Sequence, residues 1–85
     1  MAKKITIYTT PICPYCARAK QLLTKKGVAF DEIDVFMDAD KRTEMEEKSG
    51  RYTVPQVFIG DTHVGGCDEL YALEGQGGLD PLLNG

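Results

Sequence analysis

The stretch Thr10–Lys20, "TPICPYCARAK", holds two of the chain's three cysteines, separated by Pro14 and Tyr15. A Cys-x-x-Cys pair can bind a metal, form a fixed disulfide, or exchange between dithiol and disulfide. The pair directly follows an alternating run rich in Ile, Thr and Tyr, which predicts a strand, and it opens a segment with helical spacing. A Cys-x-x-Cys beside a βαβ pattern is typical of a redox site.

Cys13 is predicted to be the N-cap of the helix, because Pro14 is favoured at the first helical position. The backbone N–H groups of Tyr15 and Cys16 would then point at the Cys13 sulfur, beside the positive end of the helix dipole. Both effects favour a thiolate over a thiol. Cys13 is therefore the candidate nucleophile. Cys16 is the candidate for resolving a mixed disulfide formed at Cys13.

Length and composition place the chain in an ordinary globular class. Its 85 residues predict a single domain over residues 1–85, with 42% hydrophobic and 27% charged residues. A net charge of −3 argues against a nucleic-acid partner. The apolar runs are too short to span a membrane, and the first residues lack the apolar region of a signal peptide. We therefore expect a cytoplasmic monomer that binds neither membrane nor nucleic acid.

Charge is unevenly distributed around the cysteine pair. Residues 11–30 contain four basic and no acidic side chains, whereas residues 31–50 contain eight acidic and three basic ones. The odd cysteine count does not suit a disulfide-built secreted protein, and a persistent bridge is not expected in a reducing compartment. Three interpretations of the cysteine pair therefore remain. It could bind a metal, it could undergo redox exchange, or it could be a buried pair without a chemical role.

The periodicity predicts an α/β protein with the order β-α-β-α-β-β-α. Strands are expected over 4–10, 28–35, 55–60 and 62–64, and helices over 14–26, 38–49 and 68–74, with a last turn over 79–83. Ala39 and Met45 are the main apolar positions of the second helix. Strands joined by a helix favour a parallel, right-handed crossover, and the final pair forms an antiparallel hairpin. The product is a four-stranded mixed sheet with helices on both faces.

Two further patches carry alternatives. Thr53-Val54-Pro55 could simply begin an edge strand, or a cis proline could expose the preceding backbone groups to an extended peptide. In the segment "VGGCDEL", free N–H groups at a helix start could hold a carboxylate, and Asp68 could accept from a ligand ammonium. The plain alternatives are a glycine turn and a helix cap. Cys67 has its own plain interpretation as a small buried residue.

A zinc site is the metal alternative. Cys13, Cys16, His63 and Cys67 provide the four ligands that tetrahedral zinc requires. The long segment between the two pairs has the pattern of regular structure, and such spacing does not favour a zinc site. We therefore expect no metal.

Four sequence blocks resemble the glutaredoxin family, and within it the small bacterial dithiol class. They are "CPYC" at 13–16, "TVPQVFI" at 53–59, "GGCDEL" at 65–70 and "YALEGQGGLDPLL" at 71–83. The resemblance covers nearly the whole chain. It implies a thioredoxin fold with Pro55 in cis and glutathione as co-substrate. The glutathione groove that it implies is formed by Tyr15, Thr53, Val54, Pro55, Gly66, Cys67 and Asp68.

The resemblance also implies a reaction. Cys13 would attack a glutathionylated client protein and become glutathionylated itself. A second glutathione, or Cys16, would then release it, so that protein disulfides are substrates too. The alternatives are a glutathione-ligated iron–sulfur cluster carrier and a thioredoxin-like dithiol donor. Thr10 stands where many members carry lysine, and Arg51 is a candidate for the compensating charge.

Overall fold

The computed structural model describes residues 3–84 and contains four strands and four helices over that range. In chain order these are β1 (Ile5–Thr9), α1 (Pro14–Lys25), β2 (Asp31–Asp34), α2 (Ala39–Ser49), β3 (Gln56–Ile59), β4 (Thr62–Gly65), α3 (Cys67–Gly75) and α4 (Leu79–Asn84). The predicted element order is confirmed, and the expected last turn is the short helix α4.

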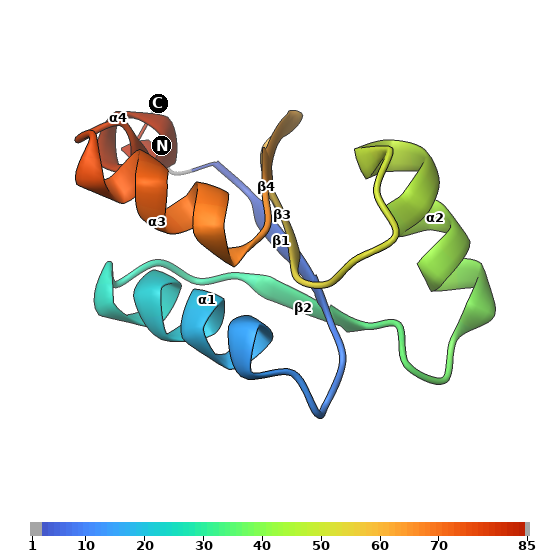
Figure 1. Cartoon of the computed structure of the whole chain (residues 1–85). Coiled ribbons are helices and arrows are strands. Elements are labelled where there is room, and N and C mark those ends of the chain that lie inside the picture. The colour runs from blue at the N-terminus through green and yellow to red at the C-terminus, as the bar shows by residue number, and fades with distance from the viewer. Residues whose placement is uncertain (1–2, 85) are drawn as a thin grey trace.

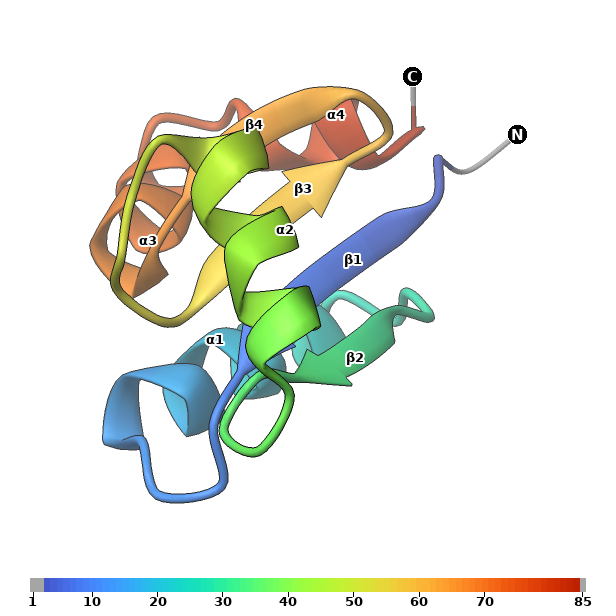
Figure 2. The ribbon, with the colours of Figure 1, turned by 90° about the vertical axis from the view of Figure 1, so that its right-hand side faces the viewer.

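The four strands form one mixed sheet with the order β2-β1-β3-β4. β1 pairs with β2 in parallel, whereas β3 is antiparallel to both β1 and β4. Helices α1, α3 and α4 cover one face of the sheet, and α2 covers the other alone (Figures 1 and 2). The predicted mixed sheet with helices on both faces is thus confirmed.

Alternation along β1 builds a separate core on each face. Ile5 and Ile7 point toward α1, α3 and α4, where they join the larger apolar cluster with Leu23 and Leu70. Tyr8 points the other way and packs with Met45 and neighbouring side chains under α2. The period-two pattern of a strand therefore explains why one short segment supports both layers.

Helix α2 is held by few contacts. Asp38 caps its first turn by accepting from the Lys41 N–H at 3.0 Å, and Met45 is its one buried side chain. The Tyr8 hydroxyl also donates to a Glu44 carboxylate oxygen at 2.5 Å. The expected apolar contribution of Ala39 is wrong, since Ala39 is exposed.

The second strand is shorter than its apolar pattern suggested. Pairing with β1 begins at Asp31, so residues 28–30 form an irregular segment that precedes the strand. Phe30 packs against the larger cluster and Ile33 against the cluster under α2. The two side chains therefore pack on opposite faces of the sheet.

The other boundaries differ by one or two residues. β3 begins just after Pro55, and α3 begins at Cys67 and ends at Gly75. The last turn predicted over 79–83 is α4, which begins at Leu79 and extends one residue further, to Asn84.

The two ends of the described chain meet, because the Lys3 N–H donates to the Leu83 carbonyl at 3.4 Å. None of the helices in residues 3–84 has the length and apolar character needed to cross a membrane.

Candidate active site

Cys13 lies at the N-cap of α1, where its backbone is extended with φ −147° and ψ 104°. Pro14 begins the helix, as predicted. The Cys16 N–H donates to the Cys13 sulfur, with N and Sγ 3.2 Å apart. The sequence also predicted such a bond from Tyr15, but the bond in the structure comes from Cys16. No acidic side chain lies in the first turn, so the half-buried sulfur meets the positive end of the helix.

Cys16 lies behind Cys13 and is only 1% exposed. Burial, followed by the hydrogen bond with Cys13, raises the pKa of the Cys16 thiol to about 12. Cys16 is therefore a protonated thiol near neutral pH. The two sulfurs differ in access, as a nucleophile and a resolving cysteine must.

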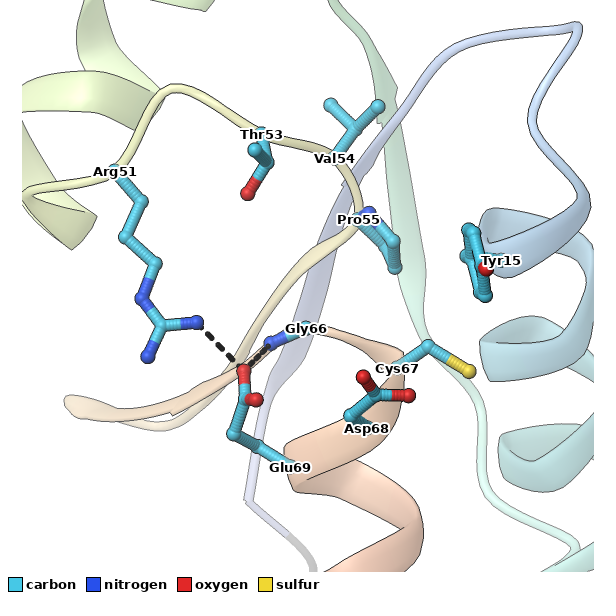
Figure 3. A pocket seen from close by; sticks show the side chains of 9 residues that line it. All are labelled: Tyr15, Arg51, Thr53, Val54, Pro55, Gly66, Cys67, Asp68 and Glu69. Atoms are coloured by element: carbon cyan, nitrogen blue, oxygen red, sulfur yellow. Dashed lines mark hydrogen bonds and ion pairs between the residues drawn. The ribbon is translucent and has the colours of Figure 1, made fainter.

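A groove of about 310 Å³ opens beside this pair (Figure 3). All seven residues expected from the family resemblance line it, together with two others. The full lining is Tyr15, Arg51, Thr53, Val54, Pro55, Gly66, Cys67, Asp68 and Glu69. The Cys13 sulfur lies 3.9 Å from the Val54 carbonyl oxygen, which places it beside the groove.

One wall of the groove is the segment that leads into β3. The Val54–Pro55 peptide bond is cis, as the resemblance implied. Gln56 is fully buried, and its amide nitrogen donates to the Thr53 carbonyl at 3.0 Å and the Thr53 hydroxyl at 3.2 Å. The Gln56 amide oxygen lies 2.7 Å from Nε2 of His63. Gln56 therefore fixes this wall from beneath, a role that sequence reasoning did not assign.

The other wall is the turn from β4 into α3. One carboxylate oxygen of Glu69 accepts from the Gly66 N–H at 2.7 Å and from Arg51 Nη1 at 2.6 Å. The Gly66 N–H first, and then the Arg51 guanidinium, lower the pKa of Glu69. Glu69 thus joins the two walls (Figure 3). Sequence reasoning missed this role of Glu69, whereas Arg51, the candidate for a compensating charge, does lie in the groove.

Cys67 is 5% exposed and lines the groove at the start of α3. Burial raises the pKa of its thiol, an effect that Arg18 partly opposes. The plain expectation of a buried cysteine is therefore met, whereas a contact between Cys67 and glutathione stays a prediction. The neighbouring Asp68 side chain is exposed on the same wall.

The four residues of the zinc alternative do not form one cluster. His63 contacts Gln56 and the ring of Phe58, whose centroid lies 4.9 Å away. Within residues 3–84 there is no group of three or more His, Cys, Asp or Glu side chains placed to hold a metal ion. The arrangement of the cysteines instead suits exchange chemistry at a groove that can hold a small peptide.

The Glu69 link leads to a prediction for Gly65→Ala. Gly65 has φ +119°, and a Cβ there would lie 2.6 Å from the Glu69 carboxylate oxygen and 3.0 Å from its Cβ. We expect a loss of about 2–4 kcal/mol in the free energy of unfolding, from backbone strain and the displaced Glu69. Denaturant titration measures it.

Gly50→Ala is the matched control. Gly50 has φ +70°, and a Cβ added there would meet open space, so only the left-handed backbone is penalised, by about 1–2 kcal/mol. Equal losses for the two variants would show that the contact with Glu69 has no energetic consequence.

The chain is similar in sequence to known glutaredoxins over most of its length. The Glutaredoxin family model matches residues 5–64. Glutaredoxin 3 of Escherichia coli (strain K12) is 60% identical over 79 residues, which cover 93% of this chain and 95% of that protein. The match therefore includes both walls of the groove and the cysteine pair.

Two solved structures are similar in fold. The solution structure of glutaredoxin from Brucella melitensis has a TM-score of 0.86 at 60% identity, covering 96% of this chain and 89% of that one. The crystal structure of a buckwheat glutaredoxin–glutathione complex has a TM-score of 0.88 at 30% identity, covering 96% and 77%. Both similarities extend over almost all of the chain described above.

Proposed function

The chain belongs to the glutaredoxin family and has its thioredoxin fold, and we propose that it is a glutathione-dependent thiol–disulfide oxidoreductase. One observation carries the proposal. A half-buried Cys13 sulfur at a helix N-terminus lies beside an open groove, with a buried, protonated Cys16 behind it. This is the division of labour that two-step thiol–disulfide exchange requires.

The proposed reaction begins at Cys13. Its thiolate attacks the glutathione sulfur of a glutathionylated client, and the client sulfur leaves as a thiol after taking up a proton. The Cys13–glutathione disulfide is then opened by a second glutathione, which yields glutathione disulfide. Alternatively, Cys16 attacks Cys13 and releases glutathione, so that a Cys13–Cys16 disulfide forms. Protein disulfides are reduced by the same pair, since Cys13 attacks the client and Cys16 then releases it.

The groove presents groups that suit each part of glutathione. The Thr53–Val54 backbone can pair with the extended tripeptide, as in strand addition. The N–H groups at the start of α3 suit the γ-glutamyl carboxylate, and the Asp68 carboxylate suits the adjacent ammonium. Arg51 is the cation of the opposite wall and suits the glycyl carboxylate. The buckwheat relative forms a complex with glutathione, which supports this assignment.

The deciding experiment follows reduction of a small glutathionylated disulfide, with and without added glutathione. Glutathione disulfide formation is coupled to glutathione reductase and NADPH oxidation. We expect turnover only when glutathione is present. Turnover that needs a thioredoxin-type flavoprotein reductase instead would favour the dithiol-donor alternative.

The iron–sulfur alternative has its own test. Cysteine thiolates ligate such clusters. However, Pro14 and Tyr15 follow Cys13 in this chain, whereas cluster carriers more often have small residues at these positions. We expect a colourless protein after anaerobic purification with glutathione. A brown protein whose absorbance depends on Cys13 would support the carrier.

Asp68→Ala tests the groove independently of the cysteines. The variant should raise the KM for glutathione by roughly threefold to tenfold, because one charge-assisted contact is lost, with little change in kcat. Steady-state kinetics over a range of glutathione concentrations measure both constants. Asp61→Ala, in the exposed β3–β4 turn, is the control and should behave as the unaltered protein. An unchanged KM would leave Asp68 as an acidic residue in the first turn of α3, where Gly66 and not Asp68 is the N-cap.

A further inference from the structure

We propose that Lys20 is a positioning residue for the second step of the reaction, in which Cys16 attacks the Cys13–glutathione disulfide. This inference rests on the proposed function. It gives a role to a cluster of Thr9, Glu32 and Lys20 that lies outside the groove and that the first step does not use.

The second step poses a problem of charge. Only a thiolate attacks a disulfide at a useful rate, yet Cys16 is 1% exposed. Burial is the largest cause of its raised pKa, and the neighbouring Cys13 sulfur raises the pKa further. Two effects act in the opposite direction: a backbone hydrogen bond with Thr10 lowers the Cys16 pKa, and after it the positive charge of Lys20 lowers this pKa too. Lys20 is thus the cationic side chain that favours the reactive form of Cys16.

The helix position and the hydrogen bonds of Lys20 determine where its charge lies. Lys20 follows Cys16 by four residues in α1, so the two side chains are neighbours on one side of the helix. The Lys20 ammonium donates to a Glu32 carboxylate oxygen at 2.9 Å. That same oxygen accepts from the Thr9 hydroxyl at 2.7 Å. The lysine is therefore anchored to β2 and β1, instead of extending freely into solvent.

The anchor connects to the end of β1. Thr9 is 1% exposed and ends β1, directly before the loop that carries Cys13. The Thr9 hydroxyl first, and then Lys20, lower the pKa of Glu32, so this carboxylate stays charged and keeps its hold on the ammonium. Two paired strands and one helix thus fix where the Lys20 charge lies relative to Cys16.

The chemical step balances without any added reagent. Cys16 loses its proton to water, and its thiolate sulfur bonds to the Cys13 sulfur. The bond between Cys13 and glutathione breaks, and the electron pair leaves on the glutathione sulfur, which takes up a proton. Cys16 and Cys13 end as an internal disulfide, and glutathione ends reduced. Lys20 stabilises the negative charge on Cys16 as the attack begins and contributes no atom to the products.

The test measures ring closure, which is the formation of the Cys13–Cys16 disulfide with release of glutathione. Reduced protein is mixed with excess glutathione disulfide and quenched with acid at set times. Mass spectrometry then separates the reduced, glutathionylated and internally bridged species. In Lys20→Gln we expect ring closure to slow by roughly threefold, the size of a partly exposed charge effect, with a corresponding accumulation of the glutathionylated species. Lys20→Arg keeps the charge and the bond to Glu32 and should restore the rate.

Two controls separate this role from a structural one. Lys25→Gln removes an exposed charge from the last turn of the same helix. In this variant the Cys13–Cys16 disulfide should form at the rate of the unaltered protein. In a Cys16→Ser background, Lys20→Gln should not change the rate at which Cys13 is glutathionylated, which a general disturbance of α1 would change.

The proposal is overturned if the rate of ring closure in Lys20→Gln equals that of the unaltered protein. It is likewise overturned if ring closure in Lys20→Arg is as slow as in Lys20→Gln. It is also overturned if Lys20→Gln slows glutathionylation in the Cys16→Ser background, since the charge would then act on the first step. Ring closure needs no turnover of a client. A protein that closes in a Lys20-dependent way but does not use glutathione to reduce a glutathionylated substrate would refute the proposed function and leave this inference intact.

Discussion

Cys13→Ser should lose glutathione-dependent reduction by on the order of a thousandfold or more, down to the background rate. The serine hydroxyl can still accept the Cys16 N–H, so the start of α1 should keep its geometry. An alcohol is not ionised in this environment and does not form a mixed disulfide. Coupled NADPH oxidation gives the rate, and mass spectrometry after exposure to glutathione disulfide shows whether a glutathione adduct forms at any cysteine.

The thermal midpoint of Cys13→Ser should remain close to that of the unaltered protein, which shows that lost activity reflects lost chemistry. Cys67→Ser provides the comparison within the same groove, because it removes a thiol that the proposed reaction does not use. Appreciable turnover by Cys13→Ser would move the nucleophile to another sulfur and refute the assigned roles.

Cys16→Ser should separate the two halves of the reaction. Reduction of protein disulfides should fall by roughly a hundredfold or more, because no second thiol remains to resolve the mixed disulfide. Reduction of glutathionylated substrates should persist, since a second glutathione can open the Cys13–glutathione disulfide. Parallel assays with one substrate of each type measure the two rates on the same preparation.

The high pKa of Cys16 gives this prediction a pH signature. The internal resolving step should accelerate by about tenfold per pH unit between about pH 6 and 9, because the thiolate fraction rises in that proportion while the pH stays below the pKa of about 12. The step is absent in Cys16→Ser. If Cys16→Ser abolished reduction of glutathionylated substrates outright, the division of roles between the two cysteines would be wrong.

Local signals in the sequence were sufficient for most of the fold. Alternating side chains in β1 and the proline after Cys13 located the first strand and helix within a residue or two. The start of β2 was misplaced because Val28 and Phe30 are apolar for a reason other than strand pairing: both pack against the core before the strand begins. Ala39 was assigned to a buried face because periodicity does not show how little of α2 contacts the sheet.

The groove lining followed from the family resemblance, whereas the contacts that hold it together did not. Arg51 and Glu69 are 18 residues apart and meet only because the α2–β3 segment passes the start of α3. Gln56 is a polar side chain in a strand, and its buried bonds to Thr53 depend on the turn before it. The Lys20–Glu32 pair likewise needs the register of β2 against β1. Such pairings are products of tertiary structure and leave no local pattern.

The bond between Lys3 and Leu83 has a consequence for engineering. The two ends of the described chain are adjacent and lie across the molecule from the loop that carries Cys13 (Figure 1). A short linker could therefore join them, and new termini could be opened in the exposed turn at Gly60 and Asp61, which contributes nothing to the groove. Such a circular permutant would traverse the elements in a different sequence while presenting the same sulfur to its substrates.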